Sequence, residues 1–188
     1  IKLINRMKGF FWKRMLYVIN TAELMAQGYL CPLEYIDRSV VEHEALKLNK
    51  SYSDFDLEAY EDELTKCQQQ IMDAITYGMN TSKSTLVFCS SVSQANRWAG
   101  LIRGAVAVSA KTPKKERDRI IREFKSHEIP IVFNVGVLTI GFDHPTLDCI
   151  ILLRPTRSIG LYYQMLGRGV RVAPGKTSCK VIDMTSTV

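Results

Sequence analysis

The sequence predicts an α/β fold, in which a parallel β-sheet is covered by helices on both faces. Two observations support this prediction. From residue 84 onward, short β-rich runs alternate with helical segments of about 10–15 residues, which is the pattern of βαβ units. The run Thr85–Cys89 is short and largely apolar, as expected of a strand buried on both faces.

The first part of the chain is less regular. In residues 1–28, Thr21 is suited to cap a short helix that runs through Gln27, and Gly28 is suited to end it. A strand is predicted around Leu33–Val41, where β-rich residues follow a proline.

A longer helix is predicted over Phe55–Tyr77, after a polar, turn-like stretch at 47–54. Its acidic start suits the positive end of the helix dipole, and Gly78 is suited to end it. We interpret this segment as a surface helix or a connector.

The remaining elements alternate regularly. Ser91 or Ser93 caps one helix, and Thr112 caps another whose first turn contains Pro113, with Glu116 close enough to favour the dipole. Strands are predicted at 85–89, 105–108, 131–133, 147–153 and 180–184, and helices at about 91–103, 112–126 and 159–166.

The composition of the chain indicates what kind of partner it binds and in which cellular compartment it works. The net charge of +6 and the pI of about 9.1 fit an anionic partner such as nucleic acid, without proving one. The five cysteines include no C-x-x-C pair, so we expect buried thiols in a reduced, cytoplasmic protein. No apolar run reaches the roughly 18 residues of a membrane span, and we expect no membrane partner. The scattered histidines predict no metal site.

The stretch Gln164–Arg171 is the strongest candidate site. Arg168 and Arg171 are three residues apart, so on a helical turn they share a face and can aim at one target. A guanidinium matches an oxyanion bidentately, which favours a phosphate or a carboxylate. The alternative is a solvated basic turn.

Two further candidate loops follow predicted strands, at the sheet edge where parallel sheets usually bind ligands. Ser90 and Ser91 precede a helix whose free N–H groups could bind an anion, although plain N-capping is the alternative. In the loop that starts at Asn134, Thr139 could contact a phosphate, and Asp143 could accept from a hydroxyl or pair with an arginine. The alternative is a long connection stabilised by an Asp turn.

These motifs together resemble helicase motifs four, five and six. Leu86–Cys89, Asn134–Pro145 and Gln164–Arg171 have the order and about the spacing found in the second RecA-like domain of superfamily-two, DEAD/DEAH-type DNA helicases. The restriction-subunit and phage branch is the most similar. The resemblance is strong over Ser84–Val188 and weaker at Tyr29–Leu33.

The resemblance implies a domain division. Residues 1–28 would connect to a missing first motor domain, and 29–188 would form the second RecA-like domain, with a helical insertion at 42–83. The chain would then be a piece of a longer protein.

The resemblance also implies roles for single residues. Arg171 aligns with the arginine finger that reaches the γ-phosphate of ATP bound on the other domain, and Arg168 and Gln164 would support it. Gly141 and Asp143 align with positions that face the nucleotide and its arginines. The residues expected to face a bound nucleic-acid strand are Ser90, Ser91, Lys111, Asn134 and Thr139.

The sequence lacks the motifs that hold ATP phosphates and Mg²⁺ in this family. Gly175-Lys176-Thr177 resembles the end of a phosphate-binding loop, but position 170 is Val170 where that loop needs glycine. We interpret these three residues as a turn. ATP and Mg²⁺ would bind to the first domain, and this chain alone would be inactive.

The expected function is therefore that of the second motor domain of an ATP-dependent DNA helicase or translocase. A second enzyme reading is the translocase subunit of a restriction or repair system. A non-enzyme reading is a degenerate RecA-like module that only binds nucleic acid.

Overall fold

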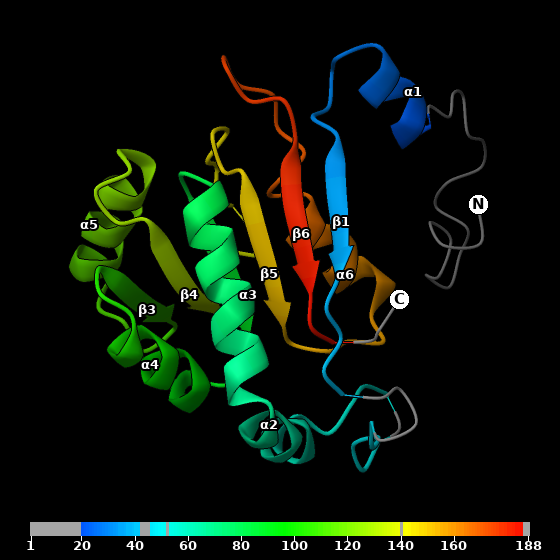
Figure 1. Cartoon of the computed structure of the whole chain (residues 1–188), viewed down its shortest axis with the longest axis vertical. Coiled ribbons are helices and arrows are strands. Elements are labelled where there is room, and N and C mark those ends of the chain that lie inside the picture. The colour runs from blue at the N-terminus through cyan, green and yellow to red at the C-terminus, as the bar shows by residue number, and fades with distance from the viewer. Residues whose placement is uncertain (1–19, 42–45, 52, 140, 186–188) are drawn as a thin grey trace, which may run out of the picture.

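The computed structural model describes residues 20–41, 46–51, 53–139 and 141–185. Its centre is a six-stranded, entirely parallel sheet with strand order β1-β6-β5-β2-β4-β3 (Figure 1). The strands are β1 Leu33–Asp37, β2 Thr85–Cys89, β3 Ala105–Ser109, β4 Ile131–Val135, β5 Cys149–Leu153 and β6 Cys179–Asp183. The helices are α1 Thr21–Ala26, α2 Leu57–Lys66, α3 Gln68–Thr81, α4 Val92–Leu101, α5 Lys114–Lys125 and α6 Ile159–Leu166.

Helices cover both faces of the sheet, which confirms the predicted architecture. Successive strand residues point to opposite faces, so Val87 packs with buried residues of α3 and α4, whereas Leu86 packs with those of α5 and α6. Figure 1 shows α3 in front of the sheet and α6 behind it. The strands β2 and β5 are buried at every position, because they lie in the middle of the sheet between two layers of helices.

The predicted helix over 55–77 is two helices. The chain leaves the helical conformation at Cys67, which has φ −112° and ψ 29° and separates α2 from α3. Helix α2 begins after Asp56, whose carboxylate caps it by accepting from the N–H groups of Glu58 and Ala59. The expectation of a surface helix is wrong for α3, because Ile71 and Ile75 are fully buried on the sheet.

The sequence predicted that Gly78 ends the helix, but Gly78 lies inside α3. A Cβ atom there would be 3.2 Å from the Cys149 Sγ atom and 3.3 Å from the Ile151 Cδ1 atom. The glycine therefore serves the close approach of α3 to β5.

The segment before α2 is tied to the rest of the domain. Asp54 accepts from the Arg157 backbone N–H at 2.7 Å and from the Thr156 hydroxyl at 3.1 Å, which links it to the connection between β5 and α6. The division of the chain at residues 28 and 83 stays a prediction, and residues 1–19 and 42–45 lie outside the described part.

Smaller differences concern the ends of elements. Strand β1 ends at Asp37 instead of continuing to residue 41, and Asn20 caps α1 in place of Thr21. Thr112 does not cap α5, because its hydroxyl accepts from the Ser109 N–H instead. The prediction that Ser91 caps α4 is confirmed.

The thiol and membrane predictions can be compared with the described residues. Cys31, Cys89, Cys149 and Cys179 are buried free thiols, and Cys67 is half-buried. Within the described ranges, no helix has the length and apolar character needed to cross a membrane. Trp98 is 4% exposed and packs in the core.

Replacing Gly78 tests whether close packing sets its identity. Gly78→Val should destabilise the fold by about 2 kcal/mol, because the added carbons overlap Cys149 and Ile151. The measurement is urea unfolding followed by circular dichroism. Gly100→Ala is the control, since nothing lies within 4 Å of its Cβ position, and it should be neutral or stabilising. Equal midpoints for both variants would refute the packing explanation.

Candidate nucleotide and nucleic-acid site

The predicted site residues lie at two opposite ends of the sheet. Ser90 and Lys111 follow β2 and β3 at the carboxyl end of the strands. Helix α6 starts after β5 at the carboxyl end and leads the chain back toward the amino end of the sheet. The arginine pair therefore lies at the amino end, where the Val170 carbonyl accepts from the N–H of Cys31, just before β1, at 2.7 Å. The pair thus does not share the carboxyl end of the sheet with Ser90 and Lys111.

One loop connects the two ends. The chain leaves the carboxyl end of β4 and enters β5 at its amino end, and its described residues Leu138, Phe142 and Leu147 are buried on the face covered by α5 and α6. Phe142 points inward and stacks on Phe124 with ring centroids 6.1 Å apart. His144 also points inward, and its Nε2 atom lies 2.7 Å from the Ser84 hydroxyl. Asp143, between two buried residues, therefore points outward.

Asp143 and Arg171 form an ion pair. The Asp143 Oδ1 atom is 2.7 Å from an Arg171 guanidinium nitrogen, and the two side chains are 54% and 47% exposed. This is one of the two options for Asp143 that the sequence left open. An exposed pair of this kind adds only about 0–1 kcal/mol to stability, so its guanidinium is free to exchange partners.

Arg168 approaches the same bend from α6. One of its terminal nitrogens donates to the Phe142 carbonyl at 2.6 Å, and its Nε atom donates to the Gln164 carbonyl at 3.3 Å. Burial, together with the nearby charge of Arg171, lowers the pKa of Arg168 from its ordinary value, while Asp143 opposes the shift. The two guanidinium groups thus converge on residues 142 and 143, beside Gly141, which is exposed and has φ +72°.

Gly169 allows the arginine loop to lie close to the sheet. A Cβ atom there would be 2.6 Å from the Cys179 Sγ atom and 3.0 Å from the Ile150 Cδ1 atom, so no larger residue fits. The side chain of Gln164 is exposed one turn before Arg168.

Lys176 is the residue of this region that the sequence reasoning missed. Its Nζ atom donates to the carbonyls of Pro145 at 3.1 Å, Gly169 at 2.7 Å and Arg171 at 2.9 Å. The signal available in the sequence is the Pro174-Gly175 pair, which predicts a reversal that returns the next residue toward Arg171.

Three of the five predicted nucleic-acid contacts are buried. Ser90 is 8% exposed, and its hydroxyl donates to the Leu153 carbonyl at 3.2 Å. Asn134 is fully buried and accepts from the N–H groups of Val137 and Leu138 at 3.2 and 2.9 Å. Thr139 is 5% exposed. All three residues lie inside the domain, and the side chains of Ser90 and Asn134 hydrogen-bond to its own backbone. This burial does not fit the expected contact with a phosphate backbone.

Ser91 and Lys111 remain accessible at the carboxyl end. The Ser91 hydroxyl accepts from the Gln94 N–H at 3.1 Å, which is the capping alternative, while Lys111 is exposed. Lys111 lines a groove of about 300 Å³ between α4 and the chain that follows β3, and the lining also includes Val92, Asn96, Ser109, Thr112 and Pro113.

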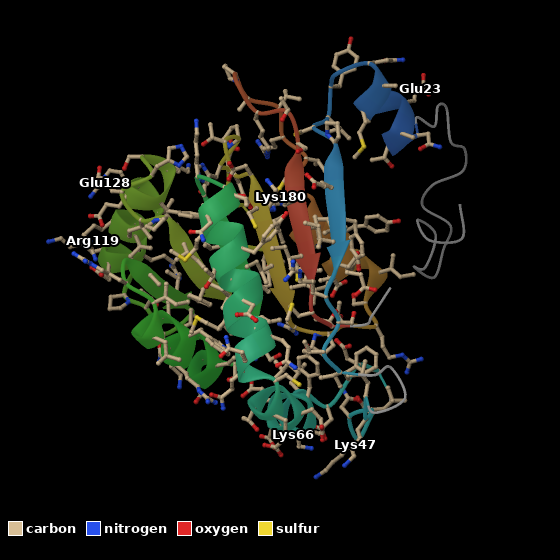
Figure 2. The ribbon with its side chains drawn as sticks, in the orientation of Figure 1. Glu23, Lys47, Lys66, Arg119, Glu128 and Lys180 are labelled. Carbon is tan, nitrogen blue, oxygen red and sulfur yellow. The ribbon has the colours of Figure 1, made fainter. Side chains whose placement is uncertain are left out.

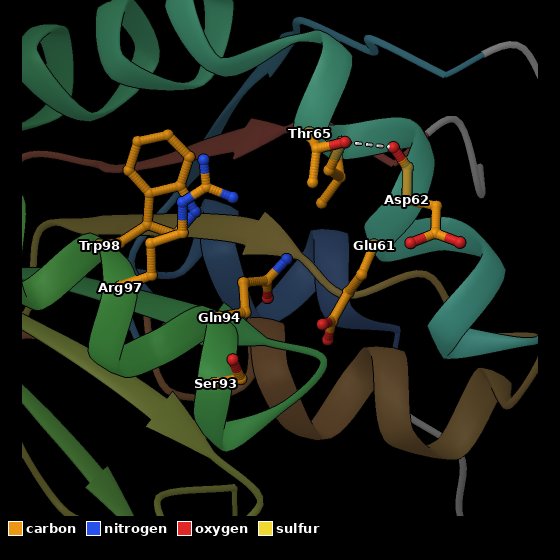
Figure 3. A pocket seen from close by; sticks show the side chains of 8 residues that line it. Glu61, Asp62, Thr65, Ser93, Gln94, Arg97 and Trp98 are labelled. Carbon is orange, nitrogen blue, oxygen red and sulfur yellow. Dashed lines mark hydrogen bonds between the residues drawn. The ribbon is translucent and has the colours of Figure 1, made fainter.

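A second hollow of about 190 Å³ separates α2 from α4 (Figure 3). Glu61 and Asp62 line its α2 side, and Gln94, Arg97 and Trp98 line its α4 side. Two carboxylates against one guanidinium make this hollow a poor site for a phosphate. Among the described residues, no group of three His, Cys, Asp or Glu side chains could hold a metal ion.

Residues 63–173 match the family described as helicase conserved C-terminal domain. The chain belongs to this helicase family. The match extends from α2 through the arginine pair and stops before Lys176.

Relatives and solved structures agree with this family. The chain is 46% identical over 76 residues, 40% of its length, to the yeast (Saccharomyces cerevisiae) protein named "Putative ATP-dependent helicase IRC3". It is 35% identical over 122 residues, 54% of its length, to the EcoKI type I restriction endonuclease subunit of Escherichia coli. It spans only 11% and 10% of the length of these two proteins.

The fold is that of a RecA-like helicase C-terminal domain. The C-terminal domain of the DEAD-box protein Dbp5 superposes with a TM-score of 0.53 at 16% identity, over 85% of this chain and 79% of that one. The RecA-like fold predicted for this helicase domain is therefore confirmed.

The buried His144 predicts a pH-dependent stability. Burial, with the positive charges of His127, Lys125 and Lys176, lowers the pKa of His144 to about 4, against a weaker opposite effect of Asp148. Between pH 6.5 and 4 the unfolded chain binds this proton and the folded chain does not, so stability falls as the pH is lowered. The loss between pH 7 and 5 should be about 2 kcal/mol.

The measurement is urea unfolding at both pH values. His144→Gln should show a clearly smaller loss, because a glutamine does not titrate. His127→Gln is the matched control, an exposed histidine beside the same ring, and should keep most of the loss. An unchanged loss in His144→Gln would contradict the assignment.

Proposed function

We propose that this chain is the second motor domain of an ATP-dependent DNA helicase or translocase, with Arg171 as its arginine finger. The observation that carries the proposal is the half-exposed Arg171 guanidinium, held by Asp143 beside Arg168. Membership of the helicase family supports the setting, and the local geometry supports the role.

The Arg171–Asp143 ion pair suits an arginine finger in the absence of ATP. A carboxylate presents oxyanions to a guanidinium as a phosphate does, so Asp143 can hold Arg171 in place until a γ-phosphate competes for it. In this proposal ATP and Mg²⁺ bind to a first motor domain, and closure of the two domains brings the γ-phosphate to Arg171. The guanidinium then stabilises the charge that spreads over the γ-phosphoryl oxygens in the transition state.

Arg168 takes a supporting role. Two of its nitrogens hold backbone carbonyls, one at the bend and one in α6, so it fixes the distance between Asp143 and the end of the helix. Its remaining donors can contribute charge at the nucleotide, and the exposed Gln164 and Gly141 border the same surface.

The nucleic-acid track would lie at the opposite end of the sheet. Ser91, Lys111 and the groove next to Lys111 offer a hydroxyl, a cation and concave surface there. Contacts of this kind bind phosphates without reading sequence, as a translocating motor requires. The relation to a restriction endonuclease subunit favours DNA as the strand. Residues 136–148 reach both ends, so they are the natural route by which hydrolysis and strand binding influence each other.

The same relation favours the second candidate, a translocase subunit of a restriction or repair system, which shares this motor. A degenerate binding module is disfavoured, because such a module would not need Arg171, Arg168 and Asp143 held together at one surface. The domain division at residues 28 and 83 and a cytoplasmic location belong to the proposal as well.

Replacing Arg171 tests the function. In the protein that joins this chain to its first motor domain, Arg171→Ala should lower kcat for nucleic-acid-stimulated ATP hydrolysis by about 10³-fold, because the transition state loses its guanidinium. Steady-state phosphate release is the measurement, and the isolated chain should release none.

Arg122→Ala is the matched control, since Arg122 is an exposed arginine on α5 away from the pair. It should hydrolyse ATP at the parent rate. Hydrolysis by Arg171→Ala at the parent rate would refute the finger, and steady hydrolysis by the isolated chain would refute the two-domain scheme.

A further inference from the structure

The ammonium of Lys176, in the Gly175-Lys176-Thr177 turn, lies within hydrogen-bond distance of three oxygens. It donates to three backbone carbonyls of the chain itself, those of Pro145, Gly169 and Arg171. An ammonium has three donors and no acceptor, so these contacts use its whole capacity. The acceptors come from two different loops, which meet at this one atom.

The turn explains how Lys176 reaches this position. The Lys176 N–H donates to the Ala173 carbonyl at 3.1 Å, and Gly175 has φ +76°, with Pro174 before it. This is the arrangement of a type II turn, which reverses the chain and brings Lys176 back over Arg171.

We propose that Lys176 is a positioning residue for Arg171. Its ammonium binds the carbonyl of Arg171 itself, and the carbonyl of Pro145 two residues after Asp143. The backbone at Arg171 and the backbone two residues after Asp143 therefore both bind the Nζ atom of Lys176. The inference rests on the proposed function, because positioning matters only if Arg171 acts on a phosphate.

This role predicts an effect on turnover more than on folding. The Pro145 and Arg171 carbonyls lie at exposed positions and can bind water if the ammonium is removed, whereas the carbonyl of the buried Gly169 loses its partner. The fold should therefore survive with reduced stability. The direction of the Arg171 side chain would no longer be fixed. A displacement of about 1 Å in a catalytic group can cost about 10²-fold in rate.

The test replaces Lys176 by methionine in the protein that contains both motor domains. Lys176→Met should lower kcat for nucleic-acid-stimulated ATP hydrolysis by about 10- to 100-fold, with KM for ATP within about threefold. The variant should remain folded under the assay conditions, which a cooperative unfolding transition in urea would show.

Lys180→Met is the matched control. Lys180, labelled in Figure 2, is another half-buried lysine of the same region, but its Nζ atom donates to a single carbonyl, that of Thr81. Its ammonium donates to neither loop of the ion pair, and its backbone N–H, which donates to the Asp148 carbonyl, is kept in the variant, so the replacement should leave kcat unchanged. A loss of kcat in Lys180→Met equal to that in Lys176→Met would overturn the specific role of Lys176.

A double variant separates this inference from the function beneath it. If Lys176 acts through Arg171, adding Lys176→Met to Arg171→Ala should lower kcat by less than about twofold more. A normal kcat in Lys176→Met while Arg171→Ala is impaired would overturn the inference and leave the proposed function standing. A normal kcat in Arg171→Ala would instead overturn the proposed function.

Discussion

The structure depends on one constraint: in a parallel sheet, the chain must cross from the carboxyl end of one strand to the amino end of the next. Between β4 and β5 it does so without a helix, and the described residues of 136–148 form bends and turns packed on the face covered by α5 and α6. Phe142 and His144 are buried there, whereas the side chain of Asp143 between them is 54% exposed. The ion pair with Arg171 follows from that geometry.

The polar residues near the strand ends show what burial demands of a RecA-like domain. Ser90 and Asn134 are buried near the carboxyl ends of β2 and β4, next to backbone groups that also need partners. Their side chains satisfy those groups, since an unpaired buried polar group costs about 1–3 kcal/mol. Hydroxyls and amides that resemble ligand-binding groups in the sequence therefore serve the fold, while Lys111, one loop away, stays exposed.

The amino end of the sheet brings together the cationic side chains of Arg168, Arg171 and Lys176. Figure 2 shows Arg119 projecting from α5 at the outer edge of the domain, where Glu116 and Glu123 pair with it. Arg168 and Lys176 instead donate to backbone carbonyls, which carry no net charge, and Arg171 forms an ion pair with Asp143. A surface of this kind attracts anions and has cations already oriented by the backbone.

The sequence by itself determined the parallel α/β architecture and the arginine pair, because apolar runs and residue spacing are local signals. It also left open the pairing of Asp143 with an arginine, which the structure shows. Only the tertiary structure decided that α3 packs on the sheet through Gly78, that Ser90, Asn134 and Thr139 are buried, and that Lys176 binds three carbonyls. Those outcomes depend on contacts between segments that are far apart in the sequence, and the type of a residue does not determine which distant residues it will contact.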